Sequence, residues 1–298
     1  MTQAQTPNLI FSQHGWADTA TLMRDLAAAV APVGTVIIAS DLGFMRTWHR
    51  MEPLIAQAEQ EALNAFATYP TAQADVVGHS MGGLIWIELL TRHPEWLPHI
   101  RRLALLGSPV LGADLARMIS LLSGNFSIAS DLGRNRRNKA SQIAQQIPTL
   151  VLAGDSDGGS DGTIPITSTD VPGARVIVLK GIAHADLRTS PRVHAYLRHF
   201  FAGLPIPALT DRLVEELHKV PGMTSAHLRD FLRATITLEF VDGTTLRSWK
   251  NPAGVDHVFV ADARGHCVFG GFVGWIDAEG LALTIHGLKR QLAPYRIG

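Results

Sequence analysis

Ser80 stands between two glycines in the stretch Gly78-His79-Ser80-Met81-Gly82-Gly83. A serine on a sharp turn between a buried strand and a helix exposes its hydroxyl as a nucleophile. Glycines on both sides allow neighbouring backbone to approach closely. Chance alone gives such a pattern in about one chain in eight of this composition, so the flanking segments must support the interpretation.

The segments on both sides of Ser80 favour that turn. Residues 74–77 read Ala-Asp-Val-Val and form a short apolar run, which predicts a buried strand. Residues 84–90 are apolar on nearly every side of a helix, which predicts a helix that is buried all round. Strand, turn and helix therefore follow in the order that a serine nucleophile requires.

A serine hydroxyl becomes an efficient nucleophile only when a histidine accepts its proton and a carboxylate orients that histidine. His184 is the best placed of 13 histidines, because it follows the predicted strand 176–179 and precedes a predicted helix. The loop after the predicted strand 149–152 offers three aspartates, which are Asp155, Asp157 and Asp161. The order serine, acid, histidine is therefore available in the chain.

Several motifs resemble those of the α/β-hydrolase superfamily, in particular its lipase-like and esterase-like members. The turn His14-Gly15-Trp16 is similar to the family's His-Gly-x turn, and residues 106–116 are similar to a segment that follows the post-nucleophile strand in many lipases. The resemblance covers about residues 8–203. It implies backbone N–H donors for an oxyanion at Trp16 and Met81, with Trp16 also near the acyl pocket.

The same resemblance ranks the three aspartates of the loop after residues 149–152, which we call the acid loop. Asp161 begins the sequence Asp-Gly-Thr-Ile-Pro, which resembles the lipase-like version of this loop, so we favour Asp161 as the acid. Asp157 is the alternative, because it fits a Gly-x-x-Asp pattern directly after the strand. We expect Asp155 to hold the loop through its backbone N–H groups.

Strand-like and helix-like segments alternate over the first two hundred residues, which predicts an α/β fold with a mainly parallel, doubly wound sheet. We expect an α/β-hydrolase domain over residues 1–205, with a short cap or lid inserted at about 110–147. The cap contains an apolar piece, residues 118–122, and basic residues that we interpret as solvated surface charges. These are Arg134, Arg136, Arg137 and Lys139.

Residues 206–298 predict a small α+β appendage of undetermined role. Helices are expected at 211–219 and 225–233. Apolar and polar residues then alternate near 236–240, as in a strand, and further strands are expected at 257–261, 267–270 and 281–285. The apolar run 268–275 predicts a contact with the first domain or with a second copy. A homodimer through this region is therefore one alternative.

Composition limits the partners of the chain. Its 298 residues contain 26 basic and 26 acidic residues, so no global charge attracts nucleic acid. One cysteine, Cys267, and an N-terminus unlike a secretory signal lead us to expect a cytoplasmic protein. No apolar run is long enough to span a bilayer, and the chemistry above requires no metal or organic cofactor.

The residues together predict hydrolysis of a carboxylic ester through an acyl-enzyme, with a small-molecule ester or acyl compound of undetermined chain length as the substrate. Thioesterase, amidase and acyltransferase activities remain alternatives because they use the same triad. A non-catalytic binding or scaffold protein is a third reading. The expected substrate-binding residues are Trp16, His79, Met118, Ile119 and Leu122.

Overall fold

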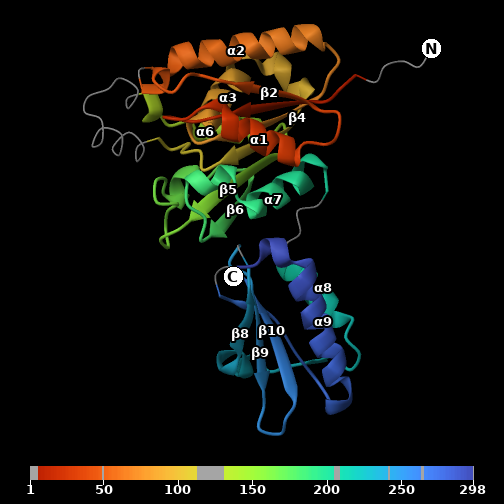
Figure 1. Cartoon of the computed structure of the whole chain (residues 1–298). Helices are drawn as coiled ribbons and strands as arrows, with labels where there is room; N and C mark the ends of the chain where they lie inside the picture. The colour runs from red at the N-terminus through yellow and green to blue at the C-terminus, as the bar shows by residue number, and fades with distance from the viewer. Residues whose placement is uncertain are drawn as a thin grey trace, which may run out of the picture. The chain divides into compact units, whose positions relative to one another are not determined.

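The computed structural model describes residues 6–48, 50–112, 131–204, 209–240, 242–262 and 265–297. The chain divides into two compact units, which are coloured along the chain in Figure 1. The first unit comprises Met1–Val178 and Ile182–Leu204, and the second comprises Leu179–Gly181 and Pro205–Gly298. Each unit is described by itself below.

The first unit is built on a six-stranded sheet with the order β2-β1-β3-β4-β5-β6. The pairs β1–β2, β1–β3, β3–β4 and β4–β5 are parallel, which confirms the predicted α/β architecture. In register, Phe11 on β1 lies opposite Ile38 and Val76. The strands are β1 (Leu9–Gln13), β2 (Val36–Ser40), β3 (Ala74–His79), β4 (Ile100–Leu106), β5 (Thr149–Asp155) and β6 (Arg175–Lys180).

Helices cover this sheet in two groups (Figure 1). Helix α1 packs against α7, and α3 packs against both α2 and α6. Ser190 caps α7 by accepting a hydrogen bond from the N–H of Arg192, and Pro191 occupies the first helical position. The helices are α1 (Ala20–Val30), α2 (Met51–Thr68), α3 (Met81–Arg92), α6 (Arg137–Ala144) and α7 (Pro191–Phe201), with short 3₁₀ segments η1 (Arg46–Trp48), η2 (Pro94–His99), η3 (Ile166–Thr169) and η4 (Ala185–Arg188).

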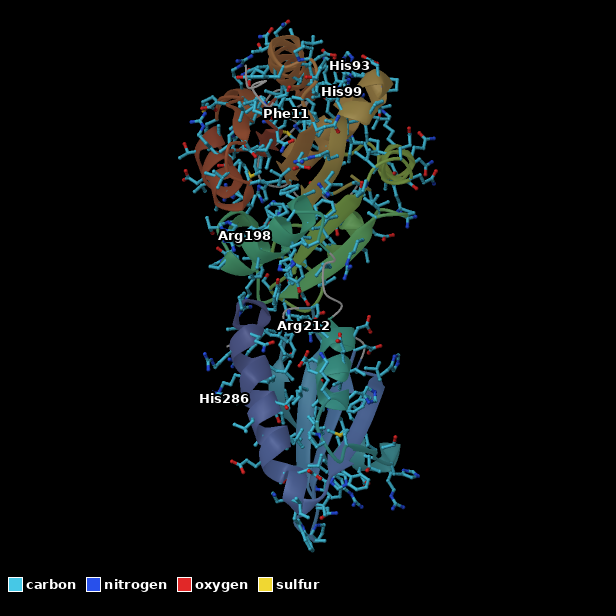
Figure 2. The ribbon with its side chains drawn as sticks, turned by 90° about the vertical axis from the view of Figure 1, so that its right-hand side faces the viewer. Phe11, His93, His99, Arg198, Arg212 and His286 are labelled. Atoms are coloured by element: carbon cyan, nitrogen blue, oxygen red, sulfur yellow. The ribbon has the colours of Figure 1, made fainter. Side chains whose placement is uncertain are left out.

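The core of the first unit lies between β1, β3 and the helices α2 and α3. Phe11 on β1, labelled in Figure 2, belongs to this core. Its ring centroid lies 4.8 Å from that of Trp86 and 5.5 Å from that of Phe66. Trp86 is buried, as are the α3 residues from Met81 to Leu90. Burial of an aromatic side chain of this size contributes about 3 kcal/mol, so α3 anchors the turn that precedes it.

Part of the predicted cap differs from our interpretation. Arg136 is buried, with 3% of its surface exposed, so the basic residues before α6 are not all solvated surface charges. The reason is a carboxylate on α3, because Arg136 Nε donates to Glu88 Oε1 at 2.7 Å. The apolar piece 118–122 lies outside the described residues.

The second unit contains a five-stranded sheet with the order β7-β11-β10-β9-β8, whose pairs are antiparallel. Helix α8 packs against α9 and β10. The predicted α+β appendage is therefore confirmed as a fold. Its elements are α8 (Leu209–His218), β7 (Thr224–Ser225), η5 (Leu228–Arg233), β8 (Thr235–Glu239), β9 (Thr245–Lys250), β10 (Asp256–Ala261), β11 (Cys267–Val273), η6 (Trp275–Asp277), α9 (Ala278–Gln291) and η7 (Ala293–Tyr295).

Two predictions for the second unit were wrong. The expected strand 281–285 is part of helix α9, because Leu281, Leu288 and Leu292 follow a helical period and are buried. Leu283, which made the short run look like an alternating strand, is 65% exposed. The expected helix 225–233 is replaced by the end of β7 and the 3₁₀ segment η5.

No helix within the described ranges combines the length and the apolar character that crossing a bilayer demands.

Candidate active site

Ser80 occupies a sharp turn between β3 and α3. Its φ of 53° and ψ of −122° lie in a region that side-chain-bearing residues rarely adopt. Its N–H donates to the Leu106 carbonyl at 2.8 Å, which ties the turn to β4. A Cβ added to Gly78 would lie 2.5 Å from the Gly83 Cα, so the expected close approach of backbone at this glycine is confirmed.

His184 and Asp161 form a hydrogen-bonded pair. His184 Nδ1–H donates to Asp161 Oδ2 at 2.6 Å, and the His184 N–H donates to the Asp161 carbonyl at 2.8 Å. The other carboxylate oxygen, Asp161 Oδ1, accepts from the N–H groups of Thr163 and Ile164 at 3.0 and 2.6 Å. Asp161 is therefore a fixed, buried acceptor for Nδ1–H, and in the neutral tautomer that makes this bond Nε2 is the acceptor nitrogen of His184.

Asp157 lies elsewhere in the same loop. Its carboxylate accepts hydrogen bonds from the N–H groups of Gly159 and Ser160 and from the Ser160 hydroxyl. The Ser160 hydroxyl and these N–H groups lower the pKa of this exposed carboxyl. Asp155 accepts from the Gly158 N–H at 2.7 Å and so holds the loop, as expected. Of the three aspartates, the structure brings Asp161 to His184.

The turn after β1 lies directly against Ser80. A Cβ added to Gly15 would be 2.8 Å from Ser80 Cβ and 3.3 Å from the Met81 nitrogen. The neighbouring His14 is buried, and its Nε2 accepts from the Leu42 N–H at 2.9 Å while Nδ1–H donates to the Gly15 carbonyl at 3.0 Å. Burial lowers the pKa of His14, so a neutral imidazole holds this turn.

The segment after Gly15 is held in part by Thr47, a residue that the sequence did not single out. Ala17 has a positive φ of 51°, and its N–H donates to the hydroxyl of buried Thr47 at 3.0 Å. The Trp16 ring packs against the Trp48 ring, with centroids 4.4 Å apart. A threonine 30 positions away carries no local pattern that could have revealed this role.

His79 points away from solvent. Its Nε2–H donates to the His184 carbonyl at 3.0 Å, and the two rings lie 4.6 Å apart. The remaining nitrogen, Nδ1, is buried and has no hydrogen-bond partner among the residues that the structure describes. Burial, reinforced by the neighbouring His184, holds the pKa of His79 well below its usual value. This neutral side chain therefore contacts His184, and its predicted part in substrate binding stays a prediction.

An ion pair joins the two loops that flank Ser80. Arg188, in η4 after His184, binds Asp18, which follows the turn at Gly15. Both side chains are 14% exposed, so solvent weakens this pair less than it would weaken one on the open surface. Sequence reasoning missed the pair, because its members are 170 positions apart.

The Ser80 hydroxyl and His184 share no hydrogen bond among the described residues. Contacts between a nucleophile and its base commonly shorten only when substrate binds. The expected substrate residues Met118, Ile119 and Leu122 lie outside the described residues. The described part of the site therefore consists of a serine turn, a histidine–carboxylate pair and a tightly packed backbone turn.

The fold and these turns define an α/β hydrolase. A family described as "Alpha/beta hydrolase of unknown function (DUF915)" matches residues 55–203, half of the 298-residue chain. The chain belongs to this family. The expected superfamily membership is thereby confirmed, and the match includes Ser80, Asp161 and His184.

Solved structures with a similar fold include three bacterial proteins. The lipase BlEst2 from Bacillus licheniformis is 16% identical over 63% of this chain and 89% of its own, with a TM-score of 0.48. The product of gene lin2722 from Listeria innocua is 16% identical over 66% and 94%, with a TM-score of 0.49. Est1E from Butyrivibrio proteoclasticus is 14% identical over 67% and 89%, with a TM-score of 0.48. A search of curated proteins returns no match.

Proposed function

We propose that this α/β hydrolase cleaves carboxylic esters through an acyl-enzyme on Ser80. The observation that carries the proposal is the 2.6 Å bond from His184 to a buried carboxylate, beside a serine held at a φ of 53°. A structural histidine needs no such carboxylate, and a serine without a chemical role is not usually kept in a strained turn.

Acylation uses Ser80, His184 and Asp161 in separate roles. His184 Nε2 takes the hydroxyl proton as Ser80 Oγ attacks the ester carbonyl, and Asp161 stabilises the resulting imidazolium. The tetrahedral oxyanion accepts hydrogen bonds from the N–H groups of Trp16 and Met81. Met81 also begins α3, whose N-terminus favours negative charge. His184 then gives its proton to the leaving alcohol.

Deacylation repeats these steps with water. His184 Nε2 removes a proton from the water, which attacks the acyl carbonyl, and the same N–H groups hold the second oxyanion. The proton returns to Ser80 Oγ as the carboxylic acid leaves. Thioesters, amides and transfer to an alcohol differ from this scheme only in the leaving group or the acceptor.

His79 acts as a positioning residue in this proposal. The carbonyl of His184 accepts its Nε2–H, and its ring packs beside the His184 ring. A second histidine that charged near pH 7 would repel the imidazolium formed during catalysis. The lowered pKa of His79 removes that conflict, since the buried ring stays neutral.

Labelling by a fluorophosphonate tests the nucleophile. We expect one label per folded chain on Ser80 and no label on Ser80→Ala. A folded wild-type protein that takes no label would refute the proposal and would favour a non-catalytic role. A series of p-nitrophenyl esters, run beside acyl-CoA thioesters, then separates an esterase from a thioesterase.

A further inference from the structure

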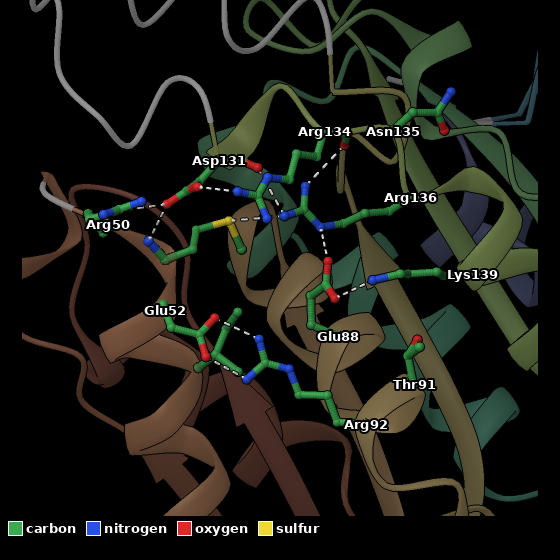
Figure 3. A pocket seen from close by; sticks show the side chains of 12 residues that line it. Arg50, Glu52, Glu88, Thr91, Arg92, Asp131, Arg134, Asn135, Arg136 and Lys139 are labelled. Atoms are coloured by element: carbon green, nitrogen blue, oxygen red, sulfur yellow. Dashed lines mark hydrogen bonds and ion pairs between the residues drawn. The ribbon is translucent and has the colours of Figure 1, made fainter.

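A charged cavity of about 490 Å³ lies in the first unit, and none of Ser80, Asp161 or His184 lines it (Figure 3). Helices α2 and α3 and the segment before α6 supply its walls. Five basic side chains and three carboxylates face it. The basic residues are Arg50, Arg92, Arg134, Arg136 and Lys139.

Two of the basic side chains, Arg136 and Lys139, already form hydrogen bonds with acceptors of this unit. The buried Arg136 donates to Glu88 Oε1 at 2.7 Å and to the Asp131 carbonyl at 2.9 Å, and Lys139 takes the other Glu88 oxygen at 2.6 Å. Burial opposes ionisation of Glu88, but Lys139 and Arg136 outweigh it and lower the pKa of this carboxyl. Glu88 is therefore a carboxylate fully used by its two partners.

Arg92 is also matched. Its two terminal nitrogens donate to the two oxygens of Glu52 at 2.7 and 2.6 Å, and this bidentate bond lowers the pKa of Glu52. One carboxylate and one guanidinium thus neutralise each other on this wall.

Arg50 and Arg134 are matched poorly. Both depend on Asp131, with nitrogen–oxygen distances of 3.9 and 3.2 Å, and they lie on either side of it (Figure 3). Asp131 also accepts from the N–H of Met51, the first residue of α2, at 3.2 Å. Within the described ranges neither guanidinium makes any other contact with an acceptor. Most of the N–H donors of Arg50 and Arg134 therefore have no acceptor among the residues that the structure describes, and these are the donors we assign to a ligand.

The charges of the cavity do not balance. Among the described residues that line it, five cations against three carboxylates leave an excess of two positive charges in a concave site, and the N-terminus of α2 adds to this excess. A guanidinium binds phosphate through parallel hydrogen bonds that a point charge cannot offer. We propose that this cavity binds a dianionic phosphoryl group through Arg50 and Arg134.

Calorimetric titration of the full chain tests this site without using its proposed hydrolase activity. Inorganic phosphate and phenyl phosphate are titrated at matched ionic strength, with sodium chloride as the blank. We expect saturable binding that weakens at least about tenfold in Arg50→Gln and in Arg134→Gln, since each loses charge-assisted bonds. Arg24→Gln is the matched control, because Arg24 is exposed on α1 and does not line the cavity.

The two ligands distinguish the source of the phosphoryl group. Equal affinity for both supports a site for free phosphate, whereas tighter binding of phenyl phosphate supports a site for a phosphorylated small molecule. The proposal is overturned if neither ligand saturates, or if Arg50→Gln and Arg134→Gln bind as the wild type does. Equal weakening in Arg24→Gln would also overturn it, because that result would indicate general screening.

Discussion

Replacing Asp161 by asparagine tests the proposed triad most directly. The side chain is buried, with 2% of its surface exposed, and each of its oxygens has a defined partner. Oδ1 accepts from the N–H groups of Thr163 and Ile164, so the oxygen of the new amide must stay on that side. Its NH₂ group then faces His184 Nδ1, where a carboxylate oxygen accepted a hydrogen bond before.

The consequence for His184 is a change of tautomer. An amide nitrogen can only donate, so Nδ1 must become an acceptor and the proton must move to Nε2. Nε2 can then no longer take the proton of Ser80. The expected loss in kcat is about 10⁴-fold, which corresponds to about 5.5 kcal/mol of transition-state stabilisation.

The matched control is Asp157→Asn, because Asp157 lies in the same loop as Asp161 and the substitution is chemically identical. Asp157 is exposed, and its hydrogen bonds within the described part of the chain go to its own loop, so we expect kcat to change by no more than about twofold. Initial rates with a p-nitrophenyl ester and circular dichroism of each variant provide the measurement. If Asp161→Asn keeps kcat within tenfold of wild type, or Asp157→Asn loses as much, our reasoning about the pair is wrong.

Three further outcomes follow from the geometry. Gly15→Ala places a Cβ 2.8 Å from Ser80 Cβ, so we expect the turn to shift and kcat to fall about 10²-fold; unchanged turnover would argue against a role for the Trp16 N–H. His79→Phe should lower kcat more than it changes KM, and His79→Gln, which retains a donor for the His184 carbonyl, should restore part of it; equal losses in both would contradict positioning. Burial disfavours the charged form of His93, but hydrogen bonds to Glu59 and Glu95 outweigh burial and raise the pKa of this side chain. The charged His93 therefore contributes fully to the stability of the fold below about pH 6.5, and this contribution is lost as pH rises through the pKa of the folded state. Denaturant unfolding from about pH 6 to about pH 9 should show this loss in the wild type and not in His93→Gln.

Local patterns were sufficient for the fold of the first unit. The apolar run 74–77 and the all-round apolar residues 84–90 predicted β3 and α3, because burial on both sides leaves a continuous hydrophobic signal. The same reasoning failed for α9, where the five residues 281–285 imitate a strand. The helical period becomes visible only over the longer span from Leu281 to Leu292.

Pairings between distant segments could not be predicted in this way. Resemblance to lipase-like loops favoured Asp161 among three aspartates within seven residues but left Asp157 open, and the contact with His184 is made by Asp161. The partnership of Arg136 with Glu88 joins positions 48 residues apart, and neither residue carries a local sign of it. Long-range contacts of this kind depend on the whole packed unit, which short patterns do not encode.

The positive φ of Ser80 has a consequence for how this position responds to mutation. Glycine adopts such a conformation without strain, so Ser80→Gly should raise the free energy of unfolding by about 1 kcal/mol relative to Ser80→Ala. Selection for stability alone would favour glycine at position 80. A serine kept at this position would therefore indicate selection for its chemistry at the expense of stability, and thermal melts of Ser80→Gly and Ser80→Ala would measure the stability that is lost.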